Sequence, residues 1–351
     1  MKNKLDFTIK TTNQIKGIAL LLMFASHLFS FPEWLVSGNE FISIPFRNNT
    51  VAYFVGKFGG VCVGIFMFLT GYGMYFSYQK GNCIVISIKK AIKFILKYWI
   101  LLFTFFLPVQ ILLGRTYFNP HKWHQELFGI YTSIVGFAWY VRFYMLAILS
   151  LPLLKRIIGK KLWSSLTLTV IPFQTIYILL WKLSTHIMFH NAEAVTLEYF
   201  KYISIVLVGY CFAKFDIYKY IDKFICTHKI NGILISVSGL SLIFIARLKW
   251  YENAKIFMPN ADIVFVPILV FCIIKLLNNF PFKLILQLLE IIGQHSMNLW
   301  FLQSIFFFET NKLQCIIYLP KLPLLILIWN IAILLPISKL YNLIYKKIHI
   351  I

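Results

Sequence analysis

The feature that most constrains the fold is the recurrence of long apolar stretches. A helix needs about 20 apolar residues to cross the hydrocarbon core of a bilayer, with a working range of about 17–25. The 351-residue chain is 60% hydrophobic, whereas soluble domains are about 45–50% apolar. We therefore predict an all-α integral membrane protein with ten transmembrane helices in one domain, residues 1–351. The expected spans are 15–31, 52–77, 91–113, 132–151, 162–182, 197–213, 230–248, 259–277, 288–308 and 322–344.

The distribution of Lys and Arg predicts how these helices are oriented. One set of alternating loops, together with both termini, carries roughly twice as many basic residues as the other set, which marks it as cytoplasmic. An even number of spans agrees with both termini lying in the cytoplasm. The basic N-terminal residues resemble a signal peptide, but residues 25–27 read Ala-Ser-His and offer no small-residue cleavage site. We expect the first span to be retained.

Charge and cysteine usage argue against two other classes of protein. The formal net charge is +22, but the basic residues are spread over alternating loops, so nucleic-acid binding is not expected. None of the six cysteines forms a CxxC pair, and we expect neither a disulfide framework nor a metal site. His186 and His190 have the i, i+4 spacing of zinc ligands, yet no HExxH motif and no evident fourth ligand accompany them.

The first span contains the strongest candidate for chemistry. Lys16 opens it and His27 lies inside it. Eleven residues correspond to roughly three helical turns, so the two side chains share one face about 16 Å apart along the axis. Ionisable residues within a membrane are costly and are functional candidates by default. We expect His27 to be neutral and able to accept a proton; the alternative is a structural histidine bonded to a neighbouring helix.

Three lysines begin the third span on its cytoplasmic side. Lys90, Lys93 and Lys97 are spaced by three and four residues, so they share one helical face. Together they are able to hold a polyanion such as the phosphates of a nucleotide. The alternative is ordinary positive-inside charge that snorkels toward lipid headgroups.

The second span is rich in glycine between residues 59 and 73. Glycine permits close helix packing, and it can equally make room for a ligand. The segment ends with Tyr72 between two glycines, on the side where the lysines lie. We expect Tyr72 to contribute to the donor site.

Two further segments place polar groups within predicted spans. Trp139, Tyr140 and Arg142 lie in the outer half of the fourth span, where they form either an acceptor site or an aromatic belt with a neighbouring arginine. An intramembrane arginine needs a partner or a water-filled cavity. His295 and Ser296 begin the ninth span, where we expect them to make contacts inside the bundle and to contribute to the acceptor site.

Five segments in this order resemble acyltransferase family 3, membrane proteins that O-acetylate bacterial surface polysaccharides. They are the basic residue and histidine at 16 and 27, FLTGYG at 68–73, KKAIK at 89–93, WYV at 139–141 followed by an aliphatic run to a proline at 152, and GQHSMNLWFLQ at 293–303. The resemblance covers nearly the whole chain. Two positions depart from the family pattern: Lys16 stands where arginine is usual, and Gln303 stands where the family has histidine.

The resemblance implies acyl transfer from acetyl-CoA or a similar acyl-CoA. It makes His27 the essential histidine, Lys16 its basic partner, and Lys90 and Lys93 a second basic pair. Lysine lacks the bidentate fork of arginine, and Gln303 cannot take up a proton, so either departure can alter the substrate or weaken the enzyme.

The resulting hypothesis is an O-acetyltransferase or O-acyltransferase in the bacterial cytoplasmic membrane. Acyl-CoA would be a co-substrate rather than a resident cofactor. The acceptor would be a polysaccharide, such as capsule, O-antigen or exopolysaccharide, or its lipid-linked precursor. Three alternatives remain open at this point: a transporter or flippase for a lipid-linked saccharide, an inactive homologue that serves as an assembly partner, and a different membrane-bound acyltransferase fold.

Overall fold

The computed structural model describes residues 7–114, 120–184, 191–253, 260–309 and 311–350. Its regular structure is almost entirely helical, which confirms the predicted all-α class. One antiparallel pair of two-residue strands, β1 (Pro45–Phe46) and β2 (Asn49–Thr50), pairs Pro45 with Thr50 in a loop. The helices are α1 (Ile9–Phe29), α2 (Val51–Gly59), α3 (Cys62–Tyr78), α4 (Cys83–Leu101), α5 (Leu107–Leu112), α6 (Trp123–Leu127), α7 (Trp139–Leu154), α8 (Leu162–Ser184), α9 (Asn191–Lys214), α10 (Ile217–Thr227), α11 (Gly232–Asn253), α12 (Asp262–Asn279), α13 (Lys283–Gln294), α14 (Ser296–Leu302), α15 (Asn311–Tyr318) and α16 (Pro323–Lys347).

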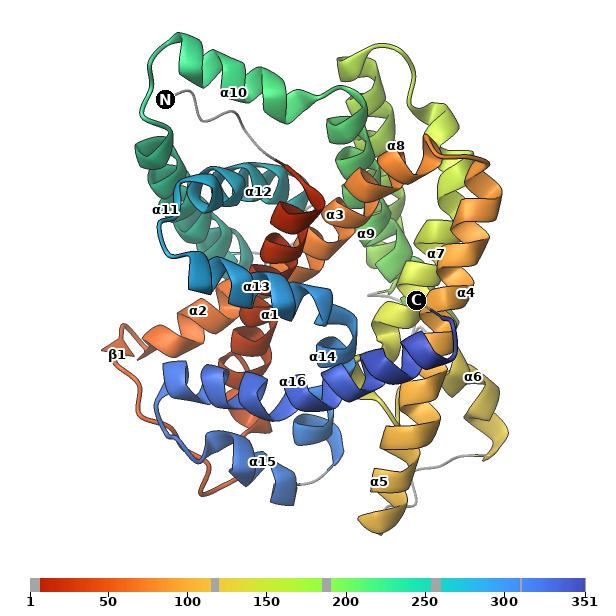
Figure 1. Cartoon of the computed structure of the whole chain (residues 1–351), viewed down its shortest axis with the longest axis vertical. Coiled ribbons are helices and arrows are strands. Elements are labelled where there is room, and N and C mark those ends of the chain that lie inside the picture. Colours follow the sequence, from red (N-terminus) through yellow and green to blue (C-terminus); the bar gives the residue numbers. More distant parts are fainter. Residues whose placement is uncertain (1–6, 115–119, 185–190, 254–259, 310, 351) are drawn as a thin grey trace.

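Eight helical stretches of the described chain are long and apolar enough to cross a bilayer. They correspond to eight of the ten predicted spans. The first predicted span is the 21-residue helix α1, whose Lys10, Gln14 and Lys16 lower its hydropathy. Because α1 contacts α2, α3, α12, α13, α14 and α16 at the centre of the bundle (Figure 1), little of its surface needs to resemble lipid.

The ninth predicted span, 288–308, is not one continuous helix. It is divided between α13, α14 and a π-helical turn at Ile305–Glu309, and the break falls at His295. The polar groups that follow the break bond sideways to α16: Asn298 Nδ2 lies 3.3 Å from the Ser338 carbonyl oxygen and 3.1 Å from Asn342 Oδ1. These lateral bonds attach α14 to α16.

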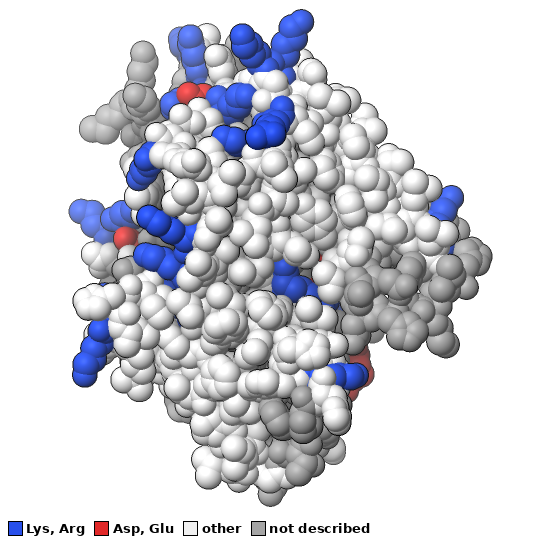
Figure 2. Space-filling view, turned by 90° about the vertical axis from the view of Figure 1, so that its right-hand side faces the viewer, with Lys and Arg blue, Asp and Glu red and all other residues white. Residues whose placement is uncertain are grey.

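Loops predicted to share a side of the membrane contact one another. On the predicted cytoplasmic side, Lys214 Nζ donates to the carbonyl oxygens of Ile158 and Gly159 at 2.8 and 2.7 Å. On the opposite side, Lys321 Nζ donates to the Gly38 carbonyl at 3.0 Å. Figure 2 shows Lys and Arg gathered mainly at the top and along one edge of a face that is otherwise largely uncharged. This arrangement agrees with the charge pattern of the loops.

Ion pairs join helices inside the bundle. Arg142 of α7 pairs with Glu198 of α9 at 2.8 Å. Arg247 of α11 pairs with Asp262 of α12 at 2.9 Å, and both side chains are only 7% exposed. Removing one partner of such a pair leaves an uncompensated buried charge. The intramembrane charges therefore fix helix positions.

Glycines permit the closest helix crossings. A β-carbon at Gly71 of α3 would overlap the Val206 carbonyl of α9, and one at Gly209 of α9 would overlap the Phe68 carbonyl of α3. Gly17 of α1 and Gly293 of α13 form a second reciprocal crossing. For Gly71 the packing interpretation of the glycine-rich segment therefore holds.

A matched pair of substitutions tests this packing. Gly71→Ala should lower the free energy of unfolding by about 1–3 kcal/mol, because the methyl group forces α3 away from α9. Gly73→Ala on the same helix meets nothing within 4 Å and should be neutral or stabilising, since alanine favours helix. Thermal unfolding in detergent measures both, and equal midpoints would contradict the packing argument.

Candidate active site

His27 lies near the end of α1 and points into the bundle. Its ring stacks on Phe137, with centroids 3.9 Å apart and planes 13° apart, and it meets the edge of Phe307 at 6.3 Å. Phe137 belongs to the short 3₁₀ turn at Gly136–Ala138 that precedes α7. The residue as a whole is only partly buried, and its ring is held by these aromatic contacts.

Gln303 fixes which nitrogen of His27 carries the proton. Its side-chain oxygen, Oε1, lies 3.0 Å from His27 Nδ1. An amide oxygen only accepts hydrogen bonds, so in this orientation Nδ1–H donates and Nε2 keeps its lone pair. Gln303 is fully buried just beyond α14. The arrangement leaves Nε2 as the nitrogen able to accept a proton.

Lys16 lines a cavity that also contains two other predicted residues. The cavity has a volume of about 190 Å³ and lies between α1, α3, α4, α7 and α14. Tyr140 and Ser296 line it together with Lys16, as do Thr70 and Trp300. Tyr140 packs on Trp300 with centroids 4.7 Å apart. The structure thus unites residues from four of the five family-like segments around one hollow.

The other predicted lysines extend the positive charge away from this cavity. Lys90 is exposed and interacts electrostatically with Lys16, Lys80 and Lys93. Lys97 is half-buried, with its ammonium group 5.3 Å from the Tyr345 ring centroid. Among the described residues no carboxylate forms an ion pair with these lysines. The cluster is an uncompensated cationic surface suited to a polyanion.

The structure does not bring Tyr72 to this cavity. Its ring packs on Phe7 at 4.4 Å and also contacts Tyr218 at 6.2 Å, in an aromatic cluster on another face of α3. Thr70 occupies the cavity wall instead. Two residues along a helix correspond to a rotation of about 200°, which explains why the two side chains part.

Three other predicted residues have partners of their own. Arg142 donates to Glu198 and to the Ile130 carbonyl, the latter at 2.9 Å. These two groups are the partners that an intramembrane arginine requires. Trp139 stacks on Tyr202 at 6.2 Å, close to the cavity wall. His295 faces α16, where its Nδ1 lies 2.8 Å from Ser338 Oγ.

Sequence reasoning missed the immediate partners of His27. Gln303 drew notice as a departure from the family pattern, but not as a hydrogen-bonding partner. Phe137 stacks on His27, and Glu198 pairs with Arg142. Neither contact can be predicted from the local sequence, because contacts between distant helices leave no periodic pattern in a single sequence. The family's histidine at position 303 was the one clue to a polar role there.

No metal centre emerges from the part of the chain that the structure describes. No group of three or more His, Cys, Asp or Glu residues in those ranges has metal-binding geometry. His186 and His190 lie outside the described residues. The candidate site is therefore built from an imidazole, an amide and a cationic cluster.

Comparison with known proteins identifies the family. A family profile described as "Acyltransferase domain", acyltransferase family 3, matches residues 10–341. No curated protein matches the chain, and no solved structure does so. The family match spans His27, Gln303 and the lysine cluster.

Replacing Gln303 tests its role in positioning His27. Gln303→Met keeps similar bulk but removes the hydrogen-bond acceptor, and we expect kcat for acyl transfer to fall about tenfold, with the KM for the donor unchanged. Gln303→Glu retains an acceptor at the same place and should recover most of the rate. Steady-state kinetics of the purified variants measure both effects. An unchanged kcat in Gln303→Met would exclude a positioning role.

Proposed function

The chain belongs to acyltransferase family 3, and we propose that it is a membrane-bound O-acyltransferase of the bacterial cytoplasmic membrane. It moves an acetyl or other short acyl group from acyl-CoA to a hydroxyl of a cell-surface polysaccharide or its lipid-linked precursor. The observation that carries this proposal is the geometry of His27: Nδ1 is bonded to Gln303 at 3.0 Å, and Nε2 is left to act as a base.

The donor binds through its charged end at the cytoplasmic surface. Lys16, Lys90, Lys93 and Lys97 attract the phosphates of acyl-CoA, and their lack of carboxylate partners among the described residues favours this role. Lys16 also lines the 190 Å³ cavity, and it lies about 16 Å from His27 along α1. The thioester arm reaches inward over this distance, past Tyr140 and Ser296.

The reaction is a direct transfer with general-base help. His27 Nε2 takes the proton of the acceptor hydroxyl. At the same time, the hydroxyl oxygen forms a bond to the thioester carbonyl carbon. The carbon–sulfur bond then breaks, and the imidazolium passes the proton to the departing thiolate, so that CoA leaves as the thiol and His27 is again neutral. Gln303 stabilises that imidazolium through Nδ1–H. Such catalysis contributes about 10²–10⁴ in rate.

The acceptor approaches from the opposite side of the membrane. There the aromatic side chains of Phe137 and Phe307 surround the imidazole. Aromatic surfaces suit the apolar faces of sugar rings. Acceptor and donor thus meet at His27 from opposite leaflets.

Substitution of His27 tests the proposed chemistry. His27→Ala should lower transfer of acetate from acetyl-CoA by about 10²–10⁴, because the base is removed while both binding regions remain. Mass spectrometry of the surface glycan from cells with the wild-type and the variant gene measures the outcome. Normal acetylation by a variant of equal abundance would overturn the assignment.

Substitution of the lysines tests donor binding. The double variant Lys90→Gln, Lys93→Gln should raise the KM for acetyl-CoA with little change in kcat, because it removes binding shared by ground state and transition state. The effect should diminish at high salt, where the charges are screened. Lys346→Gln, in the last turn of α16, is the matched control. Equal donor KM values in the double variant and the control would exclude the lysine site.

A further inference from the structure

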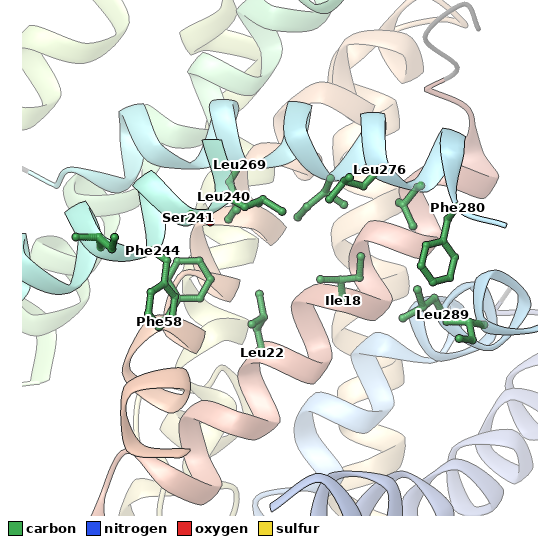
Figure 3. Close-up of a pocket in the computed structure, with 14 residues that line it drawn as sticks. Ile18, Leu22, Phe58, Leu240, Ser241, Phe244, Leu269, Leu276, Phe280 and Leu289 are labelled. Carbon is green, nitrogen blue, oxygen red and sulfur yellow. The ribbon is translucent and has the colours of Figure 1, made fainter. Parts of the chain in front are cut away.

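A long apolar groove lies beside α1, away from the cavity at Lys16. It has a volume of about 680 Å³, lies between α1, α11, α12 and α13, and includes one polar side chain, Ser241 (Figure 3). Along α12 it runs from Leu269 to Phe280, which corresponds to about 16 Å of helix, or half the hydrocarbon thickness. A groove of this length and polarity fits a hydrocarbon chain.

A second, polar cavity adjoins one end of this groove. This polar chamber has a volume of about 450 Å³, and Ser26, Lys57 and Arg247 contribute to its wall. On α1 the lining passes from Leu22 in the groove to Ser26 in the chamber, and on α11 it passes from Phe244 to Arg247. The two hollows therefore follow each other along the same helices.

Lys57 supplies the net charge of the chamber. Arg247 is neutralised by Asp262, with bonds of 2.9 and 3.1 Å, and its Nη1 donates to the carbonyls of Lys57 and Phe58. Lys57 forms no ion pair with a carboxylate in the described ranges. Its ammonium group lies 4.9 Å from the Phe31 ring centroid. The chamber therefore favours a single anionic group such as a phosphate.

Aromatic side chains lead from the chamber to the imidazole. Phe31 lines the chamber and stacks on Trp34 at 4.0 Å. The ring centroids of Trp34 and Phe307 are 6.1 Å apart, and those of Phe307 and His27 are 6.3 Å apart. A group attached to a ligand in the chamber would thus lie at the start of an aromatic path to the base.

We propose that the groove and the polar chamber bind the lipid anchor of a lipid-linked acceptor. The polyprenyl chain lies in the groove, its phosphate lies beside Lys57, and the attached saccharide extends along the aromatic path toward His27. This inference rests on the proposed function, because it names the form of acceptor that the same site uses. Proximity to His27 favours a substrate over a bulk phospholipid as the occupant.

Binding of a polyprenyl phosphate tests the inference directly. The full chain is reconstituted in phosphatidylcholine nanodiscs with a long-chain polyprenyl phosphate that carries a photoactivatable group. Cross-links should map to α11 and α12. Leu240→Trp, which fills the groove, should lower cross-linking about tenfold. Leu242→Trp is the control on the same helix, since Leu242 is 67% exposed and lies outside the groove lining.

A second pair of variants tests the headgroup without altering packing. Lys57 is exposed, so Lys57→Gln should leave thermal unfolding unchanged while weakening polyprenyl phosphate binding severalfold. Lys249→Gln, an exposed lysine near Arg247 that does not line the chamber, should have no effect. Competition with phosphatidylglycerol should displace little probe from the wild-type protein.

The outcomes separate this inference from the proposed function. Equal cross-linking in wild type, Leu240→Trp and Lys57→Gln overturns the inference, as does full displacement by phosphatidylglycerol, which would indicate a general lipid site. Because binding does not need His27, the His27→Ala protein should bind the probe as wild type does. Binding at the groove together with normal transfer by His27→Ala would overturn the proposed chemistry and leave the lipid site standing.

Discussion

The structure depends on pairing buried charges and on bonding irregular backbone where water is absent. In a bilayer core an unpaired backbone group costs several kcal/mol, so irregular backbone must be bonded within the protein. The break between α2 and α3 exposes the carbonyls of Lys57 and Phe58, and Arg247 donates to both. Asp262 balances that arginine. Arg142 and Glu198 serve the loop near Ile130 in the same way.

Positive charges inside the bundle are paired, whereas those of the lysine cluster are not. Arg142 and Arg247 each pair with a carboxylate and so fix helix positions. Lys16, Lys90, Lys93 and Lys97 gather without ion-pair partners among the described residues, although their mutual repulsion opposes compact packing. Such uncompensated repulsion is typical of a surface that binds a polyanion. Part of the net charge of +22 is thus concentrated in this lysine cluster.

The sequence allowed the membrane class and most spans to be predicted, because hydrophobic length is a local property. It singled out Lys16 for the donor and Tyr140 and Ser296 for the acceptor, and it did not predict that the three residues line one cavity. It could not predict the contact between His27 and Gln303, which are 276 residues apart, nor the break at His295. Those features depend on which helices meet, and single-sequence periodicity does not record helix partners. Tyr72 lies on another face of α3 than Thr70, because a separation of two residues rotates a side chain by about 200° around the helix axis.

The reciprocal glycine crossing of α1 and α13 has a consequence for how this enzyme can diversify. Gly17 and Gly293 bring two backbones into direct contact, ahead of the helix segments that carry His27 and Gln303. The spacing of His27 and Gln303 therefore depends on main-chain contact rather than on neighbouring side chains. Residues that line the cavity at Lys16 or the apolar groove can then be exchanged during evolution while the geometry of His27 and Gln303 is preserved. Such a scaffold lets ligand preference change without disturbing that pair.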